Sequence, residues 1–370
     1  MSPDPGAIAP RTGPDHGFEF GIFTFGELGR EADGRFASAA ARLEQLLEWA
    51  RTADAAGLDV FGVGEHHRPD FAVSAPPVVL AAAARETSRI RLTSTVTVLS
   101  SADPVRVFED FATLDLLSGG RAELTAGRGA YLESFPLFGL DLDRYDEYFE
   151  DRLDLLLEVA EHEVVDWQGS TRAPLSGAGV WPRPVQDRLP IWIAVGGTPA
   201  SVDRSGRLGL PLYQAILGAP ERFAPLARRY RAVADAAGHP ASAQRIGVTS
   251  HFHVGRTSQD ARDAFHPSYA RYIGENMPRV GVLDRASFDH WAGPHGALVV
   301  GSVAEVVDKI LWEHELLGHS RFLAQVGLGG LDQAETLRSI ELLATEVVPQ
   351  VRAALATSGP VAGARPAGVG

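Results

Sequence analysis

Residues 104–127 read PVRVFEDFATLDLLSGGRAELTAG, which predicts a helix followed directly by a strand. Proline at position 104 suits the first turn of a helix, where no amide hydrogen is needed, and the glycines at 119 and 120 suit its end. The segment RAELTAG (121–127) then predicts a short strand. This order decides the fold, because it recurs on both sides of the segment.

The alternation of strands and helices extends along most of the chain. Apolar residues at helical spacing and β-branched runs such as IRLTSTVTVL predict the two kinds of element. The predicted strands are 18–25, 59–67, 90–99, 121–127, 189–195, 210–216, 246–254 and 321–327. The predicted helices are 42–57, 78–88, 104–120, 145–161, 222–237, 303–317 and 333–354, with a further one from Pro199. This pattern is typical of a single (β/α)8 (TIM) barrel. A doubly wound sheet is the alternative, but no GxGxxG motif follows the first strand.

The barrel domain is predicted to span residues 17–355. Residues 1–16 and 356–370 are rich in Pro, Gly and Ala or Asp and predict flexible tails. Two segments interrupt the alternation: 163–186 resembles a hairpin insertion, and 263–296 has no clear periodicity. Both are either covers for the mouth of the barrel at its C-terminal face or irregular surface connections.

Composition excludes several classes of function. The 370 residues carry a formal net charge of -13, which argues against nucleic-acid and anionic-membrane partners. The chain has no cysteine, so disulfides, zinc–thiolate sites and thiol catalysis are excluded. The N-terminus has no apolar signal core, and no run reaches the ~18–20 apolar residues of a membrane helix. We therefore expect a cytoplasmic protein.

The first candidate for chemistry is Glu65-His66-His67, which follows the second predicted strand. Side chains there lie at the C-terminal end of a barrel, where active sites of this fold are found. Histidine beside a carboxylate suits a general base or a metal ligand. The alternative is a cluster that only braces the loop.

Three further segments predict a site for a flat, phosphorylated ligand. In IAVGGTPAS (193–201) a strand enters two glycines, Thr198 caps the next helix and Pro199 opens it, which leaves free amides for an anion. Arg128 stands between glycines just past a strand and suits a phosphate. The small polar residues of TSTVTV (93–98) leave room for a flat ring. The alternative for 193–201 is an ordinary capped turn. The alternative for Arg128 is a surface ion pair, and that for 93–98 is a half-buried strand.

The pair His251 and His253 is separated by one residue on a predicted strand. Alternate strand residues share a face, so both imidazoles are predicted to point into the barrel mouth. Two such histidines bind a metal in some barrel hydrolases. The alternative is that they line a substrate pocket, since no further carboxylate or lysine at a strand end completes a metal site.

In chain order these segments resemble the luciferase-like monooxygenase family. The resemblance extends from about Phe20 to Arg352 and is most specific in EHH (65–67) and DPVRVFEDFATLDLLSGGRAELTAGRGAY (103–131). It implies a TIM barrel that binds FMN at the C-terminal strand ends. It also implies that reduced FMN, supplied by a separate flavin reductase, reacts with O2 to form a flavin peroxide that oxygenates a small organic substrate. A homodimer is the expected assembly.

The resemblance also assigns residues. It implies that His66 is the catalytic histidine beside the flavin, and that Ser94 and Thr95 lie along the isoalloxazine ring, often at a non-prolyl cis peptide. It implies that Arg128 binds the phosphate and that Tyr131 lies near the cofactor. The matching phosphate loop consists of Gly196, Gly197, Thr198 and Ser201.

Two positions depart from or only partly match the family pattern. Gly127 replaces the cysteine of the light-emitting enzymes, which leaves room near the reactive carbon and argues against bioluminescence. Arg144 is a candidate for a second phosphate-binding arginine, although its spacing from the glycine at 139 is imperfect.

Three other functions remain open. A deazaflavin-dependent oxidoreductase on the same fold would transfer hydride without O2. A metal-dependent hydrolase would use His66, His67, His251 and His253. The third function is that of a barrel that binds flavin without catalysing a reaction. The organic substrate is not readable from the sequence, because loops determine it.

Overall fold

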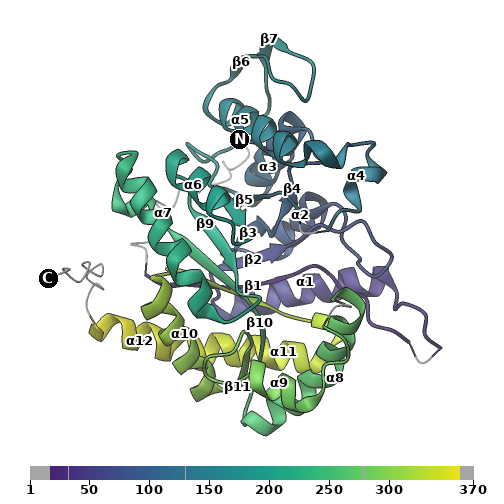
Figure 1. Cartoon of the computed structure of the whole chain (residues 1–370). Helices are drawn as coiled ribbons and strands as arrows, with labels where there is room; N and C mark the ends of the chain where they lie inside the picture. The colour runs from purple at the N-terminus through teal and green to yellow at the C-terminus, as the bar shows by residue number, and fades with distance from the viewer. Residues whose placement is uncertain (1–16, 32, 130, 278–279, 359–370) are drawn as a thin grey trace, which may run out of the picture.

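The computed structural model describes residues 17–31, 33–129, 131–277 and 280–358. Within these ranges eight parallel strands form a closed barrel with helices around it (Figure 1), which confirms the predicted TIM barrel. In order around the barrel the strands are β1 (Glu19–Thr24), β2 (Val60–Val63), β3 (Arg91–Ser94), β5 (Ala122–Gly127), β8 (Ile191–Val195), β9 (Leu212–Ala215), β10 (Ile246–Gly255) and β12 (Arg321–Gln325). Pairing of β12 with β1 closes the ring.

Several helices begin and end at residues that supply capping groups. Their bounds are α1 (Ala39–Ala56), α2 (Pro76–Glu86), α3 (Pro104–Ser118), α5 (Tyr145–Glu161), α6 (Pro199–Leu208), α7 (Ala224–Ala236), α10 (Val303–Leu317), α11 (Gln333–Leu342) and α12 (Val348–Ser358). At α3, the side chain of Asp103 accepts hydrogen bonds from two amides of the first turn, and Gly119 ends the helix at φ 68°. The helices bury their apolar faces against the outside of the barrel in one large core.

The interior of the barrel is charged at its N-terminal end. Arg321 has no exposed surface there, and its guanidinium donates to Glu19 Oε2 at 2.7 Å and to Glu123 Oε2 at 2.6 Å. Arg91 and Arg245 also pair with these carboxylates. We call these five residues the barrel-floor cluster. It closes the end of the barrel opposite to the cavity described below.

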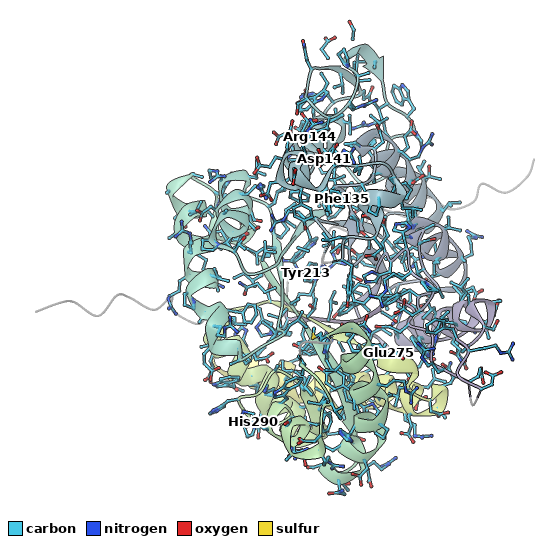
Figure 2. The ribbon with its side chains drawn as sticks, turned by 45° about the vertical axis from the view of Figure 1, so that its right-hand side comes forward. Phe135, Asp141, Arg144, Tyr213, Glu275 and His290 are labelled. Atoms are coloured by element: carbon cyan, nitrogen blue, oxygen red, sulfur yellow. The ribbon has the colours of Figure 1, made fainter. Side chains whose placement is uncertain are left out.

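An apolar layer lies above the floor. Tyr213 packs on Trp192 with ring centroids 4.6 Å apart, and its hydroxyl accepts a hydrogen bond from Arg321 at 2.8 Å. Burial raises the pKa of Tyr213 to about 12. Figure 2 shows Tyr213 near the centre of the molecule. The inside of the barrel is therefore filled up to this layer.

Four predicted boundaries need correction. The predicted strand 90–99 is interrupted: β3 ends at Ser94, the Thr95–Val96 peptide bond is cis, and β4 (Thr97–Val98) pairs with β5. The segment predicted without periodicity contains α8 (Ser258–Asn276) and α9 (Arg285–Trp291). A further strand, β11 (Val299–Ser302), pairs with β10 outside the barrel. The tail predicted from residue 356 begins inside α12, whereas residues 1–16 and 359–370 lie outside the described residues.

The predicted hairpin at 163–186 is confirmed as the antiparallel pair β6 (Val164–Trp167) and β7 (Leu175–Gly179). It projects beyond α5 at the top of Figure 1 and contributes no residue to the cavity lining. Of the two alternatives for this segment, a cover for the mouth therefore gains no support, whereas α8 does contribute to the lining. No helix in the described part of the chain combines the length and the apolar character needed to cross a bilayer.

Candidate active site

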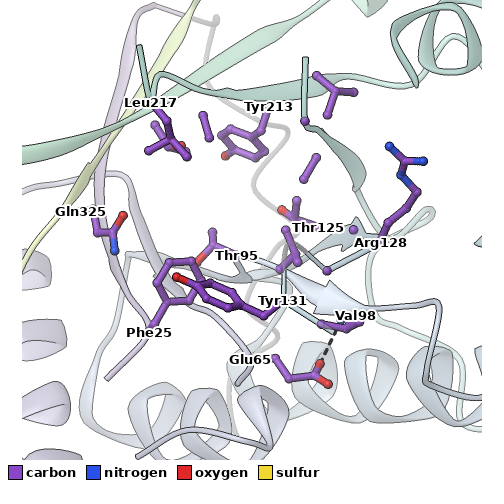
Figure 3. Close-up of a pocket in the computed structure, with 18 of the residues that line it drawn as sticks. Phe25, Glu65, Thr95, Val98, Thr125, Arg128, Tyr131, Tyr213, Leu217 and Gln325 are labelled. Carbon is purple, nitrogen blue, oxygen red and sulfur yellow. Dashed lines mark hydrogen bonds between the residues drawn. The ribbon is translucent and has the colours of Figure 1, made fainter. Parts of the chain in front are cut away.

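A cavity of about 750 Å³ lies at the C-terminal ends of the barrel strands. Each barrel strand, or the loop after it, contributes to its lining, as does the end of α8. Figure 3 shows Gln325 and Arg128 on opposite sides of the lining, with Tyr213 and Leu217 facing Phe25 and Tyr131. Its volume and position are those of a small-molecule site in this fold.

One wall of the cavity consists of small side chains. Thr95, Val96 and Gly127 come from the end of β3, the cis peptide and the end of β5. A Cβ atom added at Gly127 would lie 2.6 Å from Cγ2 of Val96, so the close approach of these two segments requires glycine. This corrects the prediction that Gly127 leaves free room, because Val96 fills it.

Several hydroxyl groups of the lining are buried and have no hydrogen-bond partner. They are Oγ1 of Thr95, Oγ of Ser134 and Oγ of Ser250, each unpaired with respect to the described residues. A buried hydroxyl without a partner costs free energy unless a ligand or water satisfies it. The cavity is therefore suited to a ligand that carries several polar atoms.

His66 lines the cavity and is almost completely buried, with 7% of its surface exposed. Its Nδ1 lies 2.9 Å from Oε1 of Glu133. Phe71, Tyr131 and Phe25 surround the ring, with centroids 4.3, 4.8 and 4.8 Å from that of the imidazole. Burial raises the pKa of Glu133, but the hydrogen bond with His66, the nearby backbone amides and the charge of His66 together outweigh it, and the net pKa is lowered, so Glu133 is an anion at neutral pH.

The neighbouring His67 forms a separate pair. Its Nε2 lies 2.9 Å from Oε1 of Glu65, which together with the nearby charges raises the pKa of His67 despite partial burial. The other oxygen of Glu65 accepts a hydrogen bond from the amide of Val98 at 3.0 Å (Figure 3). This pair braces β4, so the bracing interpretation of the motif applies to Glu65 and His67.

The predicted phosphate loop is only partly at the cavity. Gly196 and Gly197 line it, and Gly197 has φ 90°, which favours glycine. The amides of Gly196, Gly197 and Thr198 have no hydrogen-bond partner among the described residues. Thr198 stands at the N-cap position of α6, but its side chain makes no capping hydrogen bond to an amide of the helix. Its hydroxyl instead bonds Oγ of Ser201 at 2.9 Å, and neither side chain lines the cavity.

Two arginines contribute to the lining near this loop. Arg128 does so as predicted, with its guanidinium paired to Asp146. Arg222, which the sequence analysis missed, has no carboxylate partner among the described residues. Arg222 belongs to the single 3-10 turn Pro220–Phe223. A Cβ atom added at Gly197 would lie 3.9 Å from the ring of Phe223, so this turn packs beside the glycine loop. The predicted Arg144 instead pairs with Glu147 and lies far from Tyr213 in Figure 2.

Tyr131 lines the cavity as predicted, and its hydroxyl donates to Oδ1 of Asn276 at 3.3 Å. Ser94 does not line it. Its hydroxyl instead bonds the backbone of Thr125 at 3.2 Å, because adjacent strand residues face opposite sides. Of the predicted Ser94–Thr95 pair, only Thr95 therefore reaches the cavity.

The two histidines of β10 lie in different surroundings. His251 lines the cavity, and its Nδ1 lies 2.8 Å from the hydroxyl of Tyr269. His253 lies beyond the part of β10 that pairs with β12 and stacks on Phe265. Burial lowers the pKa of each to about 4, so both are neutral. No group of three or more metal-ligating side chains occurs among the described residues, and the hydrolase interpretation gains no support.

Known proteins with similar sequences or folds include enzymes. The 4-hydroxyprotoasukamycin monooxygenase of Streptomyces nodosus subsp. asukaensis is 28% identical over 84% of this chain and 87% of its own. The oxygenating component of 3,6-diketocamphane monooxygenase from Pseudomonas putida, solved with FMN, has a TM-score of 0.73 at 20% identity, over 90% of this chain and 99% of its own. The coenzyme F420-dependent tetrahydromethanopterin reductase of Methanopyrus kandleri has a TM-score of 0.70 at 18% identity over the same shares.

The family model described as luciferase-like monooxygenase matches residues 18–320, which include all the barrel strands except β12 and nearly all of the cavity lining. The chain belongs to the luciferase-like monooxygenase family.

Proposed function

We propose that this protein is a monooxygenase that uses reduced FMN and O2 to oxygenate a small organic substrate. The observation that carries the proposal is the cavity, which joins a wall of small side chains to unpartnered hydroxyls and to the buried His66–Glu133 pair. The family and its monooxygenase relative support it.

The residues present fit FMN. The wall at Thr95 and Gly127 offers a flat surface and an unpaired hydroxyl. The free amides of Gly196 and Gly197, with Arg128 and Arg222, would hold the phosphate. When bound, reduced FMN supplies the electrons that activate O2. His66 would hold or move a proton at Nε2.

The part of the cavity farther from the glycines suits an apolar substrate. Phe25, Leu217, Tyr272 and Met277 line it together with the ring of Tyr131. The neutral His251, Asn276 and the amide of Gln325 are among the polar groups on this side. We therefore expect an uncharged, mainly apolar substrate.

An anaerobic titration tests the cofactor. Reduced FMN is expected to bind with micromolar affinity or better and to react with O2 at a rate different from that of free reduced FMN. The alternative cofactor is reduced deazaflavin, because a coenzyme F420-dependent reductase shares this fold. Tight binding of the deazaflavin and not of FMN would overturn the proposal.

Arg222→Ala is expected to weaken FMN binding about tenfold, since one charge-assisted hydrogen bond is lost from a partly exposed site. Riboflavin, which lacks the phosphate, should bind the variant and the wild type equally. Arg228→Ala, which removes an exposed arginine of α7 that does not line the cavity, is the matched control. Equal losses for FMN and riboflavin would contradict a phosphate role for Arg222.

The proposal includes a cytoplasmic homodimer that receives reduced FMN from a separate reductase. The neighbouring helices α2 and α3 expose Val78, Leu116 and Leu117, with 70%, 48% and 45% of their surfaces accessible. Exposed apolar side chains on neighbouring helices suit a partner surface. Sedimentation velocity should give a dimer for the wild type and a monomer for a Leu116→Glu, Leu117→Glu variant. A monomeric wild type would remove this part of the proposal.

A further inference from the structure

The two adjacent histidines at the cavity present opposite ring nitrogens to their carboxylates. His66 uses Nδ1 toward Glu133, whereas His67 uses Nε2 toward Glu65, both at 2.9 Å. The Nε2 atom of His66 has no hydrogen-bond partner among the described residues, and the residue lines the cavity. Of this pair of described residues, only His66 therefore has a free outer ring nitrogen, Nε2, remote from its own backbone.

The position of Glu133 is fixed independently of His66. Glu133 is the residue before the short helix α4 (Ser134–Leu137), whose Ser134 and Phe135 are buried. Three aromatic rings within 5 Å restrict rotation of the imidazole. A carboxylate bound at Nδ1 of a restricted imidazole favours the tautomer with hydrogen on Nδ1, because an anion cannot donate.

We propose that Glu133 is the positioning residue of this site, which holds His66 as the Nδ1–H tautomer with the lone pair of Nε2 in the cavity. The inference rests on the proposed function for its chemistry, but its geometry belongs to the protein without ligand. Glu133 also balances the charge that His66 gains when Nε2 accepts a proton.

The proton step is simple. An acidic O–H or N–H group of the cavity's ligand breaks its bond to hydrogen and keeps the electron pair, while Nε2 of His66 takes the proton and becomes an imidazolium. The imidazolium donates at Nδ1 to Glu133 throughout, so Glu133 stays ionised. Return of the proton from Nε2 restores the starting state.

Nitrogen-15 NMR of the histidine rings in the protein without FMN tests the tautomer directly. In the wild type, the neutral His66 should carry its hydrogen on Nδ1. In Glu133→Ala this preference should be lost, while His67, which keeps its hydrogen bond with Glu65, should keep its own tautomer. Glu65→Gln is the matched control, since it should alter the signals of His67 and leave those of His66 in place.

A kinetic measurement separates positioning from folding. Glu133→Ala should lower turnover about 10- to 100-fold while the affinity for reduced FMN changes less than about twofold. Glu133→Gln serves if the alanine variant does not fold, and it should also lower turnover. An Nε2–H tautomer in the wild type, or an unchanged tautomer in Glu133→Ala, overturns the inference. Failure of the wild type to bind FMN would overturn the proposed function but leave the NMR result valid.

Discussion

His66→Ala is expected to lower oxygenation of the substrate about 10²- to 10⁴-fold, the usual contribution of a general acid or base. His66 is the one imidazole of the cavity that pairs with an ionised carboxylate and keeps its outer nitrogen free among the described residues. The affinity for reduced FMN should change little, because the phosphate cradle does not involve this side chain. The reaction is run under ¹⁸O2, and the measurement is the amount of oxygen-18 incorporated into the product for each flavin that is oxidised.

His295→Ala is the control for this variant. His295 is exposed, stacks on Trp312 and lies outside the cavity. It should leave oxygen incorporation as in the wild type. If His66→Ala oxygenates as well as the control does, His66 has no part in the proton chemistry.

The largest effect on stability is expected for Arg321→Met, which should lower the free energy of unfolding by about 3–5 kcal/mol. The variant leaves Glu19 and Glu123 buried without their central partner. Arg188→Met removes an exposed ion pair with Glu161 and should change stability by less than about 0.5 kcal/mol. Urea denaturation of the three proteins provides the comparison. Equal denaturation midpoints for Arg321→Met and the wild type would show that the ion pairs of Arg321 do not stabilise the folded protein.

The same cluster predicts how stability depends on pH. Burial raises the pKa of Glu123, but Arg321 and Arg91 outweigh it and hold the pKa at about 2, below the ordinary value of 4.5. A carboxyl with a lowered pKa in the folded state stabilises the protein above its unfolded pKa, and this stabilisation is lost as the pH falls toward the folded pKa. The wild type should therefore lose stability between pH 4.5 and about 2, and Arg321→Met should lose less over this window.

Local patterns were sufficient to predict the barrel. Each strand and its following helix carry their own signals, such as the β-branched run before Thr95 or the proline and glycines that bound α3. The helix α8 was missed because Pro267 lies inside it and its apolar residues have weak helical spacing. The barrel-floor cluster was missed because, in the sequence, a charged residue at the start of a strand looks like the end of the exposed loop before it. Only closure of the barrel buries these residues.

The candidate site was predictable where a residue lies at a strand end. His66, Thr95, Arg128, Gly196 and Gly197 all do, and the structure brings them to one cavity. Glu133 and Arg222 lie in turns, and 67 residues separate Glu133 from His66. No sequence pattern at such a distance indicates the contact, because it depends on how two loops pack.

The filled floor of the barrel also determines the route by which ligands enter and leave the cavity. Because the barrel-floor cluster and the layer of Trp192 and Tyr213 fill the lower half, the cavity communicates with solvent at the strand C-termini. Two ligands that occupy the cavity together would enter and leave through this same opening. If one ligand lies below another in this cavity, the lower one would bind first and leave last, so release of the upper ligand would govern how often the lower one is exchanged.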